Sequence, residues 1–385
     1  MSDRATSISP SVLTWARERA GLSPSEVATY MHKDVDDIVA WESGAAWPTY
    51  NQLETLAEGL FRRPVALFFF PDPPEEPAPQ QEFRTLPDFD IRLLNAHTRF
   101  AVRLARSYQE SLRELTGGVN PARRHMLRDL DPTHFSNTVS LAAAIREFLG
   151  VSLTRQKSWR NAADAMTAWR GAVEDAGVFV FKRPLKQREV SGFCLTDDEF
   201  PVVMLNNSTP FTRQVFTLFH EVSHLLYGVN SMTTLDGHFV ERMSGRPKSV
   251  EVLCNQLAAE ALVPSDSFPW DRIDRDNLVE SVSHVASIYG VSREVVLRRV
   301  LDRGWIDSAT YRDFVDKWAD DNGPGREGSG GNYYLNQAAY LGDSFLRLAF
   351  SRYRAGVISV SDLAEHLGVK AKNISRFEDV VASRL

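Results

Sequence analysis

The sequence has little cysteine, no long hydrophobic run and no excess of positive charge. Its two cysteines, Cys194 and Cys254, are too few for a disulfide framework, and we expect both to be buried small hydrophobes. No stretch approaches the roughly 20 apolar residues of a membrane-spanning helix, and the N-terminus lacks the apolar segment of a secretory signal. The net charge of −6 gives no general attraction to nucleic acid or membranes. The sequence therefore predicts a cytoplasmic protein without a membrane partner.

Composition divides the 385 residues into several predicted domains. A proline-rich acidic stretch follows the N-terminal helical pattern, and a second break, "DDNGPGREGSGGN", is rich in glycine. The overall fold predicted is α+β and mostly helical. The predicted parts are a helical bundle at 8–72, a linker at 73–90, a helical connector at 91–158, a central domain at 159–319, a glycine-rich linker at 320–332 and a C-terminal helical region at 333–385.

After Gly177 the sequence pattern changes from helical to strand-like, which predicts a small sheet in the central domain. The segments "VFVFKRPL", "VSGFCLTDD" and "EFPVVMLNN" are rich in β-branched and aromatic residues and are bounded by turn signals. We expect three antiparallel strands that pack on the helix that follows. The last of them, "PVVMLNN", is expected to offer an edge to which a peptide substrate adds as an extra strand.

That following helix, "FTLFHEVSHLLYG", contains three polar residues in an otherwise apolar run. His220 and His224 are four residues apart, so their side chains share one helix face, about 5–6 Å apart at Cβ. This spacing suits two imidazoles that converge on one Zn²⁺, and Glu221 is placed to act as a general base without being a ligand. The alternative is an ordinary core helix in which a neighbour satisfies each histidine. Any of the three polar side chains left without a hydrogen-bond partner in such a buried helix would cost about 1–3 kcal/mol.

A zinc site needs a third protein ligand, and the sequence offers more than one. Asn230 stands where the metzincin pattern has its third histidine, so that subclass is excluded. The later segment "SVEVLCNQLAAEALVP" contains Glu251 and Glu260, which lie on nearly opposite helix faces, so only one of them can reach the metal. Asn255 shares the polar edge of Glu251 and is a candidate outer hydrogen-bond partner. His238 could assist an oxyanion, but a solvated loop histidine is the simpler interpretation.

Together these motifs resemble the ImmA/IrrE family of metallopeptidases. The HExxH helix is followed about 27 residues later by E-x-x-x-N-x-x-A-x-x-x-L-x-P, which begins at Glu251, and Asn206 in the approach also matches. The resemblance covers roughly residues 160–300. It implies that His220, His224 and Glu251 bind Zn²⁺ and that Glu221 is the catalytic base. It also implies a partner, since the family is associated with cleavage of a repressor or antitoxin-like regulator in bacterial or phage stress, mobile-element or defence switches.

Residues 11–72 resemble the lambda-repressor-like (XRE) helix-turn-helix domain that family members often carry. The recognition helix of such a domain normally presents basic and amide side chains to DNA. Here its positions hold acidic or apolar residues: Asp34, Val35, Asp36, Asp37 and Ala40. Residues 11–72 contain five Lys or Arg against nine Asp or Glu. DNA binding is therefore disfavoured, and a homodimerisation or partner-docking module is the alternative.

The C-terminal segment "ISVSDLAEHLGVKAKNISRFEDV" also has a helix-turn-helix pattern. Gly368 stands at the turn, and Lys370, Lys372 and Arg376 surround the second helix. Because short helical hairpins of this kind are more often packing elements, we expect packing rather than nucleic-acid contact here.

Two functions from different classes remain. The first is a zinc endopeptidase with a narrow protein substrate, in which Glu221 acts as general base. The second is a non-proteolytic transcriptional regulator, or a toxin–antitoxin binding component, with a structural or sensory zinc site. Glu221 favours the enzyme, because a structural zinc site has no need of it.

Overall fold

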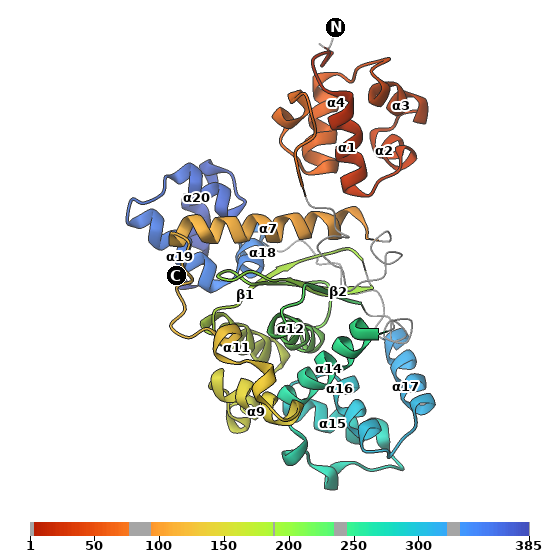
Figure 1. The fold of residues 1–385 in the computed structure, drawn as a ribbon, viewed down its shortest axis with the longest axis vertical. Helices are drawn as coiled ribbons and strands as arrows, with labels where there is room; N and C mark the ends of the chain where they lie inside the picture. Colours follow the sequence, from red (N-terminus) through yellow and green to blue (C-terminus); the bar gives the residue numbers. More distant parts are fainter. Residues whose placement is uncertain (1–3, 77–93, 188, 235–244, 322–331, 385) are drawn as a thin grey trace. The chain divides into compact units, whose positions relative to one another are not determined.

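The computed structural model describes residues 4–76, 94–187, 189–234, 245–321 and 332–384, and the chain divides into two compact units, residues 1–104 and 105–385 (Figure 1). The predicted α+β, mostly helical fold is confirmed. The finer domain boundaries stay predictions, and most of each predicted linker lies outside the described residues.

The first unit is a bundle of short helices. It contains α1 (Pro10–Ala20), α2 (Pro24–Met31), α3 (Val35–Ser43), α4 (Tyr50–Glu54), a π-helix η1 (Thr55–Phe61) and a 3-10 helix η2 (Val65–Phe69). Ser23 begins α2 with a capping box, in which its hydroxyl accepts from the Glu26 backbone N–H and the Glu26 carboxylate accepts from the backbone N–H of Ser23. Helices α2 and α3 are joined through His32, which has a left-handed backbone with φ 52°. The helices predicted from sequence are thus present, with the turn in place.

Helices also surround the sheet of the second unit. Before the sheet lie α7 (Ala96–Thr116), α8 (Met126–Asp129), η3 (Pro132–His134), α9 (Thr138–Phe148), α10 (Leu153–Lys157) and α11 (Ala162–Asp175). After it come α12 (Phe211–Leu226), α14 (Gly245–Leu262), η4 (Ser265–Ser267), η5 (Trp270–Arg272), α15 (Leu278–Tyr289), α16 (Arg293–Asp302) and α17 (Ser308–Asp321). The C-terminal helices are α18 (Tyr333–Leu341), α19 (Asp343–Arg354), α20 (Val360–Leu367), η6 (Ala371–Asn373), α21 (Ile374–Val381) and η7 (Ala382–Arg384).

The sheet differs from the predicted one in strand number, direction and order. Its strands are β1 (Phe179–Arg183), β2 (Val190–Leu195), β3 (Val202–Asn206) and β4 (Ser231–Thr234), in the order β1-β3-β2-β4. Strand β3 is parallel to β1 and antiparallel to β2, while β4 pairs antiparallel with β2. The prediction of three antiparallel strands was therefore wrong in detail, since the sheet is mixed and has a fourth strand.

The expectation that "PVVMLNN" offers a sheet edge was also wrong. Strand β3 pairs on both sides, and every one of its residues is buried. A run with almost no polar residue is typical of a strand covered on both faces. The short connection between β2 and β3 places the two strands side by side. Among the described strands, the edges are β1 and, on the far side of β2, the short strand β4.

Helix α12 packs closely on one face of this sheet, with α11 and α14 beside it (Figure 1). A Cβ added at Gly192 on β2 would lie 2.8 Å from the Thr217 side chain on α12 and 2.8 Å from the Met204 carbonyl oxygen on β3. On the other side of α12, the rings of Trp169 and Phe219 meet edge to face at 4.7 Å between centroids. Contacts on both sides therefore fix the position of α12.

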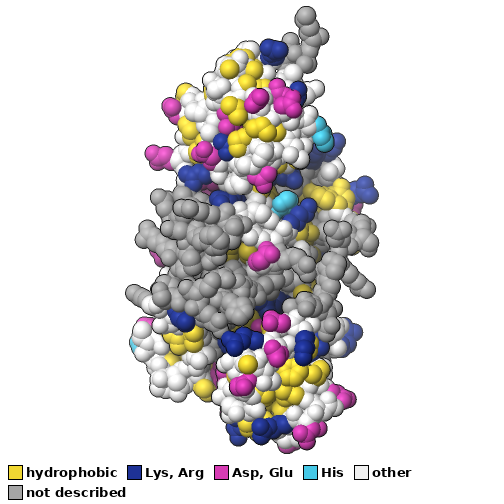
Figure 2. Space-filling model, turned by 90° about the vertical axis from the view of Figure 1, so that its right-hand side faces the viewer, with side chains coloured by type: hydrophobic (Ala, Val, Ile, Leu, Met, Phe, Trp, Pro, Cys, Tyr) yellow, Lys and Arg dark blue, Asp and Glu magenta, His cyan; other side chains and the backbone are white. Residues whose placement is uncertain are grey.

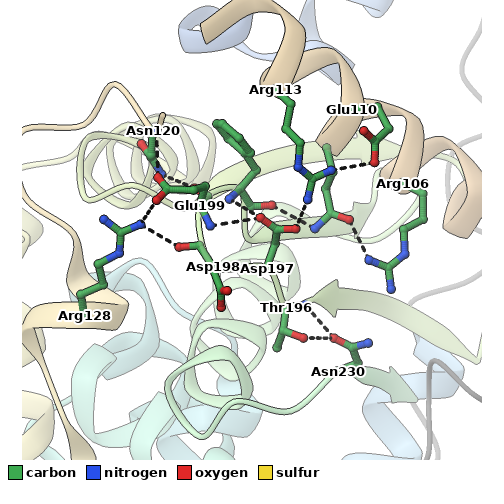
Figure 3. Close-up of polar contacts among 12 residues, drawn as sticks. Arg106, Glu110, Arg113, Asn120, Arg128, Thr196, Asp197, Asp198, Glu199 and Asn230 are labelled. Atoms are coloured by element: carbon green, nitrogen blue, oxygen red, sulfur yellow. Dashed lines mark hydrogen bonds and ion pairs between the residues drawn. The ribbon is translucent and has the colours of Figure 1, made fainter. Parts of the chain in front are cut away.

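The turn between β2 and β3 is held by residues of α7, of the loop after it and of α8 (Figure 3). Arg113 on α7 is paired with Asp197. Asn120 donates from its backbone N–H to the Glu199 carboxylate at 3.0 Å, and Arg128 pairs with the same carboxylate at 2.5 Å. These contacts attach this end of the sheet to α7, to the loop at Asn120 and to α8.

Candidate metal centre

Helix α12 carries His220, Glu221 and His224 into the interior of the second unit. Their exposed fractions are 1%, 0% and 0%. The helix begins directly after Pro210 and ends before Gly228, whose φ of 67° suits a glycine after a helix. Apolar neighbours in the same helix are buried as well, so water does not solvate these three polar groups.

Helix α14 brings a carboxylate to the two histidines. The Nε2 atoms of His220 and His224 lie 3.0 Å apart. Glu251, which is 4% exposed, places Oε2 at 3.3 Å from the His220 nitrogen and Oε1 at 3.2 Å from the His224 nitrogen. Three candidate ligand groups from two helices therefore converge on one point.

The three residues fit a tetrahedral metal ion. Ligand atoms at about 2.0–2.1 Å from a zinc ion in tetrahedral geometry are roughly 3.3 Å from one another, close to the separations found here. Burial raises the pKa of Glu251, but its hydrogen bonds with His220 and His224 outweigh burial and place that pKa below its usual range. The carboxylate is therefore ionised, as a metal ligand must be.

Glu221 turns towards β4 rather than joining the three candidate ligands. The Ser231 hydroxyl donates to Oε2 at 2.5 Å, and the Thr233 hydroxyl donates to Oε1. Ser231 and Thr233 are two apart on a strand, so both face the helix. The sequence interpretation missed both residues, because their role depends on how β4 pairs with β2.

Comparison with known families places this site inside a recognised domain. Residues 173–301 match the IrrE N-terminal-like domain, Peptidase_M78. We call this segment the M78 domain. The match covers about a third of the chain, and it supports the ImmA/IrrE family and a metallopeptidase-type function. No curated protein in the comparison matched the chain.

The M78 domain contains His220, Glu221, His224 and Glu251, and it extends from α11 to α16. The match does not include the first unit, so its assignment as an XRE domain stays a prediction. No described helix is long and apolar enough to cross a membrane.

The Nδ1 and Nε2 atoms of the two histidines differ in their contacts with described residues. The Nδ1 atoms of His220 and His224 are buried and have no hydrogen-bond partner among the described residues. Metal-binding histidines usually donate from this nitrogen to a partner. Asn255, the predicted outer partner, lies one turn after Glu251 and is half-buried; its role stays a prediction.

Asn230 anchors the start of β4 within the M78 domain. Its side-chain oxygen accepts from the backbone N–H of Thr196 at 2.6 Å and from the hydroxyl of Thr196 at 2.7 Å (Figure 3). Ser231 follows directly, so the same link that ties β4 to the β2–β3 turn positions the first donor to Glu221. Asn230, whose presence excluded the metzincin pattern, thus has a structural role in holding β4.

Both cysteines are free and buried, as expected. The Cys194 thiol lies 3.5 Å from the Ser231 hydroxyl, and burial raises the pKa of both thiols well above its usual value. Neither cysteine belongs to the group of converging ligand atoms among the described residues.

The alternative third ligand, Glu260, has other partners. Its carboxylate pairs with Arg299 at 2.6 Å and accepts from the Ser265 backbone N–H at 2.8 Å. It lines a cavity of about 460 Å³ between α9 and the end of α14, which none of the three converging residues lines. His238 lies outside the described residues.

Proposed function

We propose that the M78 domain is a zinc-dependent endopeptidase that cleaves a specific regulatory protein, such as a repressor or antitoxin-like partner. The observation that carries this proposal is the buried convergence of His220, His224 and Glu251, with their three ligand atoms 3.0–3.3 Å apart. Without a metal, the described residues offer these buried ligand atoms only one another as partners. With one, each becomes a ligand.

In such a site Zn²⁺ supplies a Lewis acid that polarises the substrate carbonyl. His220, His224 and Glu251 would hold the ion from two helices. Glu221 accepts the proton of the attacking water and returns it to the leaving amine as a general base and acid. Ser231 and Thr233 hold its carboxylate through both oxygens, so they are positioning residues.

The substrate surface we propose is the edge strand β4. Among the described strands it pairs only with β2, and we propose that an extended peptide pairs with its other edge. Ser231 and Thr233 alternate along this strand and touch Glu221, so a peptide paired with β4 would run past the proposed base. This proposal replaces the expectation that β3 forms the edge.

The test compares wild type with Glu221→Gln in host cells, with the N-termini of the whole proteome as readout. We expect a new N-terminus in one or a few proteins with wild type, and none with the variant. Zinc content measured on both purified proteins serves as the control, since Glu221 is not a proposed ligand. Equal zinc and no difference in N-termini would favour the non-proteolytic regulator with a structural zinc site.

The wider setting is proposed on the resemblance alone. We place the protein in the cytoplasm, in a bacterial or phage switch where partner cleavage changes gene expression. The first unit is proposed as a dimerisation or partner-docking module rather than a DNA reader. Its α3 exposes Val35 and Val39 alongside aspartates, and Figure 2 shows hydrophobic and acidic side chains together on the face that carries α2 and α3.

A further inference from the structure

Helices α20 and α21 repeat α2 and α3 of the first unit without a gap, from Ser359 to Glu378 against Ser23 to Glu42. Ser359 begins α20 with a capping box, as Ser23 begins α2. The helix then ends at Gly368 with φ 63°, at the position of His32 with φ 52°. The two segments therefore share both the start and the turn.

The buried residues correspond as well. Four positions face the interior in both segments, and each is filled by an apolar residue of similar role. The pairs are Val27 and Leu363, Ala28 and Ala364, Ile38 and Ile374, and Trp41 and Phe377. Both segments therefore pack as the same helix-turn-helix.

An ion pair from the preceding helix completes the likeness. In the first unit, Arg17 on α1 pairs with Glu42 at the end of α3, at 2.6 Å. In the C-terminal region, Arg354 on α19 pairs with Glu378 on α21, also at 2.6 Å. Glu42 and Glu378 occupy the same position, whereas Arg354 is displaced by one residue relative to Arg17. Helices α20 and α21 therefore correspond to α2 and α3 in register, and α19 takes the place of α1 with a shift of one residue.

The exposed and half-buried positions of the two recognition helices differ in chemistry. Where the first segment has aspartates, valine and alanine, the second has basic and polar residues. The corresponding pairs are Asp34 and Lys370, Asp36 and Lys372, Asp37 and Asn373, Val39 and Ser375, and Ala40 and Arg376. Lysine at the start of such a helix suits phosphates, and Asn, Ser and Arg suit base edges.

The second segment is held mainly from its buried side, although Arg376 also lies over the Tyr334 ring, 5.5 Å from the ring centroid. The buried His366 on α20 points to Glu114 on α7, and the Gln337 side chain donates to the Leu367 carbonyl at 2.7 Å. Lys370 and Lys372 are exposed, and neither forms an ion pair with another described residue. Two acidic residues follow Arg376 on α21. Glu378 is paired with Arg354, and Asp379 comes after all three basic residues in the chain.

We infer that the C-terminal helix-turn-helix binds duplex DNA, with the N-terminal end of α21 in the major groove. Lys370 and Lys372 contact phosphates at the entrance of the groove, while Ser375 and Arg376 face base edges. The protein then carries two modules of one design, of which only the second presents basic and polar side chains at the DNA-reading positions.

The test uses the full chain and a labelled 30-base-pair duplex of mixed sequence, with fluorescence polarisation in about 50 mM and 200 mM salt. The variant Lys370→Asp/Lys372→Asp installs the residues of the first segment at the same positions. We expect its affinity to fall at least tenfold, and the slope of log K against log salt to fall by about two, one for each lost phosphate contact. The lysines are exposed, so an unchanged melting temperature confirms that the fold is intact.

The matched control is Lys33→Asp/Lys317→Asp, which changes the net charge equally at two exposed lysines elsewhere. It is expected to bind within about twofold of wild type. Absence of wild-type binding at 50 mM salt, or an equal loss in the control, overturns the inference. Tighter binding to a single-stranded RNA of the same length would assign the surface to RNA instead.

Discussion

The Ser231 hydroxyl on β4 donates a 2.5 Å hydrogen bond to the carboxylate of Glu221 on α12. The bond joins the sheet edge to the proposed general base, and the Thr233 hydroxyl supplies a second one to the other oxygen. The position of this carboxylate is thus set by a strand that comes after the HExxH helix in the chain.

Removing both donors tests their importance. We expect Ser231→Ala/Thr233→Val to lower the free energy of unfolding by about 2–4 kcal/mol, because a buried carboxyl group loses two hydrogen bonds. Zinc content should not change. Urea denaturation measures the loss, and Ser223→Ala is the control, since that buried hydroxyl bonds only within α12, to the Phe219 carbonyl. A loss no larger than that of the control contradicts the proposed support of Glu221.

Metal binding is tested by elemental analysis. Wild type should contain about one zinc per chain and His220→Ala close to none, because two remaining ligands bind zinc poorly. Chelation should lower the melting temperature of wild type, since a ligand at 1,000 times its Kd stabilises by about 4 kcal/mol. The control is His366→Ala, another buried histidine, which lies away from the cluster. Zinc retained in His220→Ala would show that the metal binds elsewhere.

Lys182 on β1 gives a prediction about pH. Burial lowers the pKa of Lys182 from 10.5 to about 7, aided by Arg170, while Glu174 acts in the opposite direction. Between these two pH values the unfolded chain holds a proton that the folded chain lacks, so stability falls as pH drops from 10.5 to about 7 and is then constant.

Replacing Lys182 by Met should remove this loss. The variant should gain up to about 4 kcal/mol at pH 7, and the gain should shrink towards pH 10. Urea denaturation at several pH values measures it, with the exposed Lys157→Met as control. A gain independent of pH would point to packing rather than to the charge.

The close approach of α12 to the sheet can be tested with two glycines. Gly192→Ala should lose about 1–3 kcal/mol, since its new Cβ would meet a backbone oxygen that cannot move easily. Gly171→Ala on α11 meets nothing within 4 Å and should gain about 0.5–1 kcal/mol from helix propensity. Thermal unfolding of both variants is the measurement. Equal changes in stability for the two variants would mean that α12 can move away from the sheet without a loss of stability.

The sequence by itself determined the local features of this protein. The spacing of His220 and His224 follows from helical periodicity, and the N-terminal helices follow from capping and stop signals such as Ser23 and Gly44. The residues alone left Glu251 and Glu260 open as the third ligand, and the resemblance to the ImmA/IrrE motif implied Glu251. In the structure Glu251 lies beside the two histidines, and Glu260 is paired with Arg299.

Only the tertiary structure decided the relations between distant segments. The all-apolar run of β3 could not reveal which strands flank it, because strand order depends on connections and not on composition. Ser231 and Thr233 became partners of Glu221 only through the pairing of β4 with β2. The likeness of α20–α21 to α2–α3 became clear from shared caps, burial and ion pairs, since few of the residues are identical. Local rules act over a few residues, whereas pairing and packing bring together groups that no local rule connects.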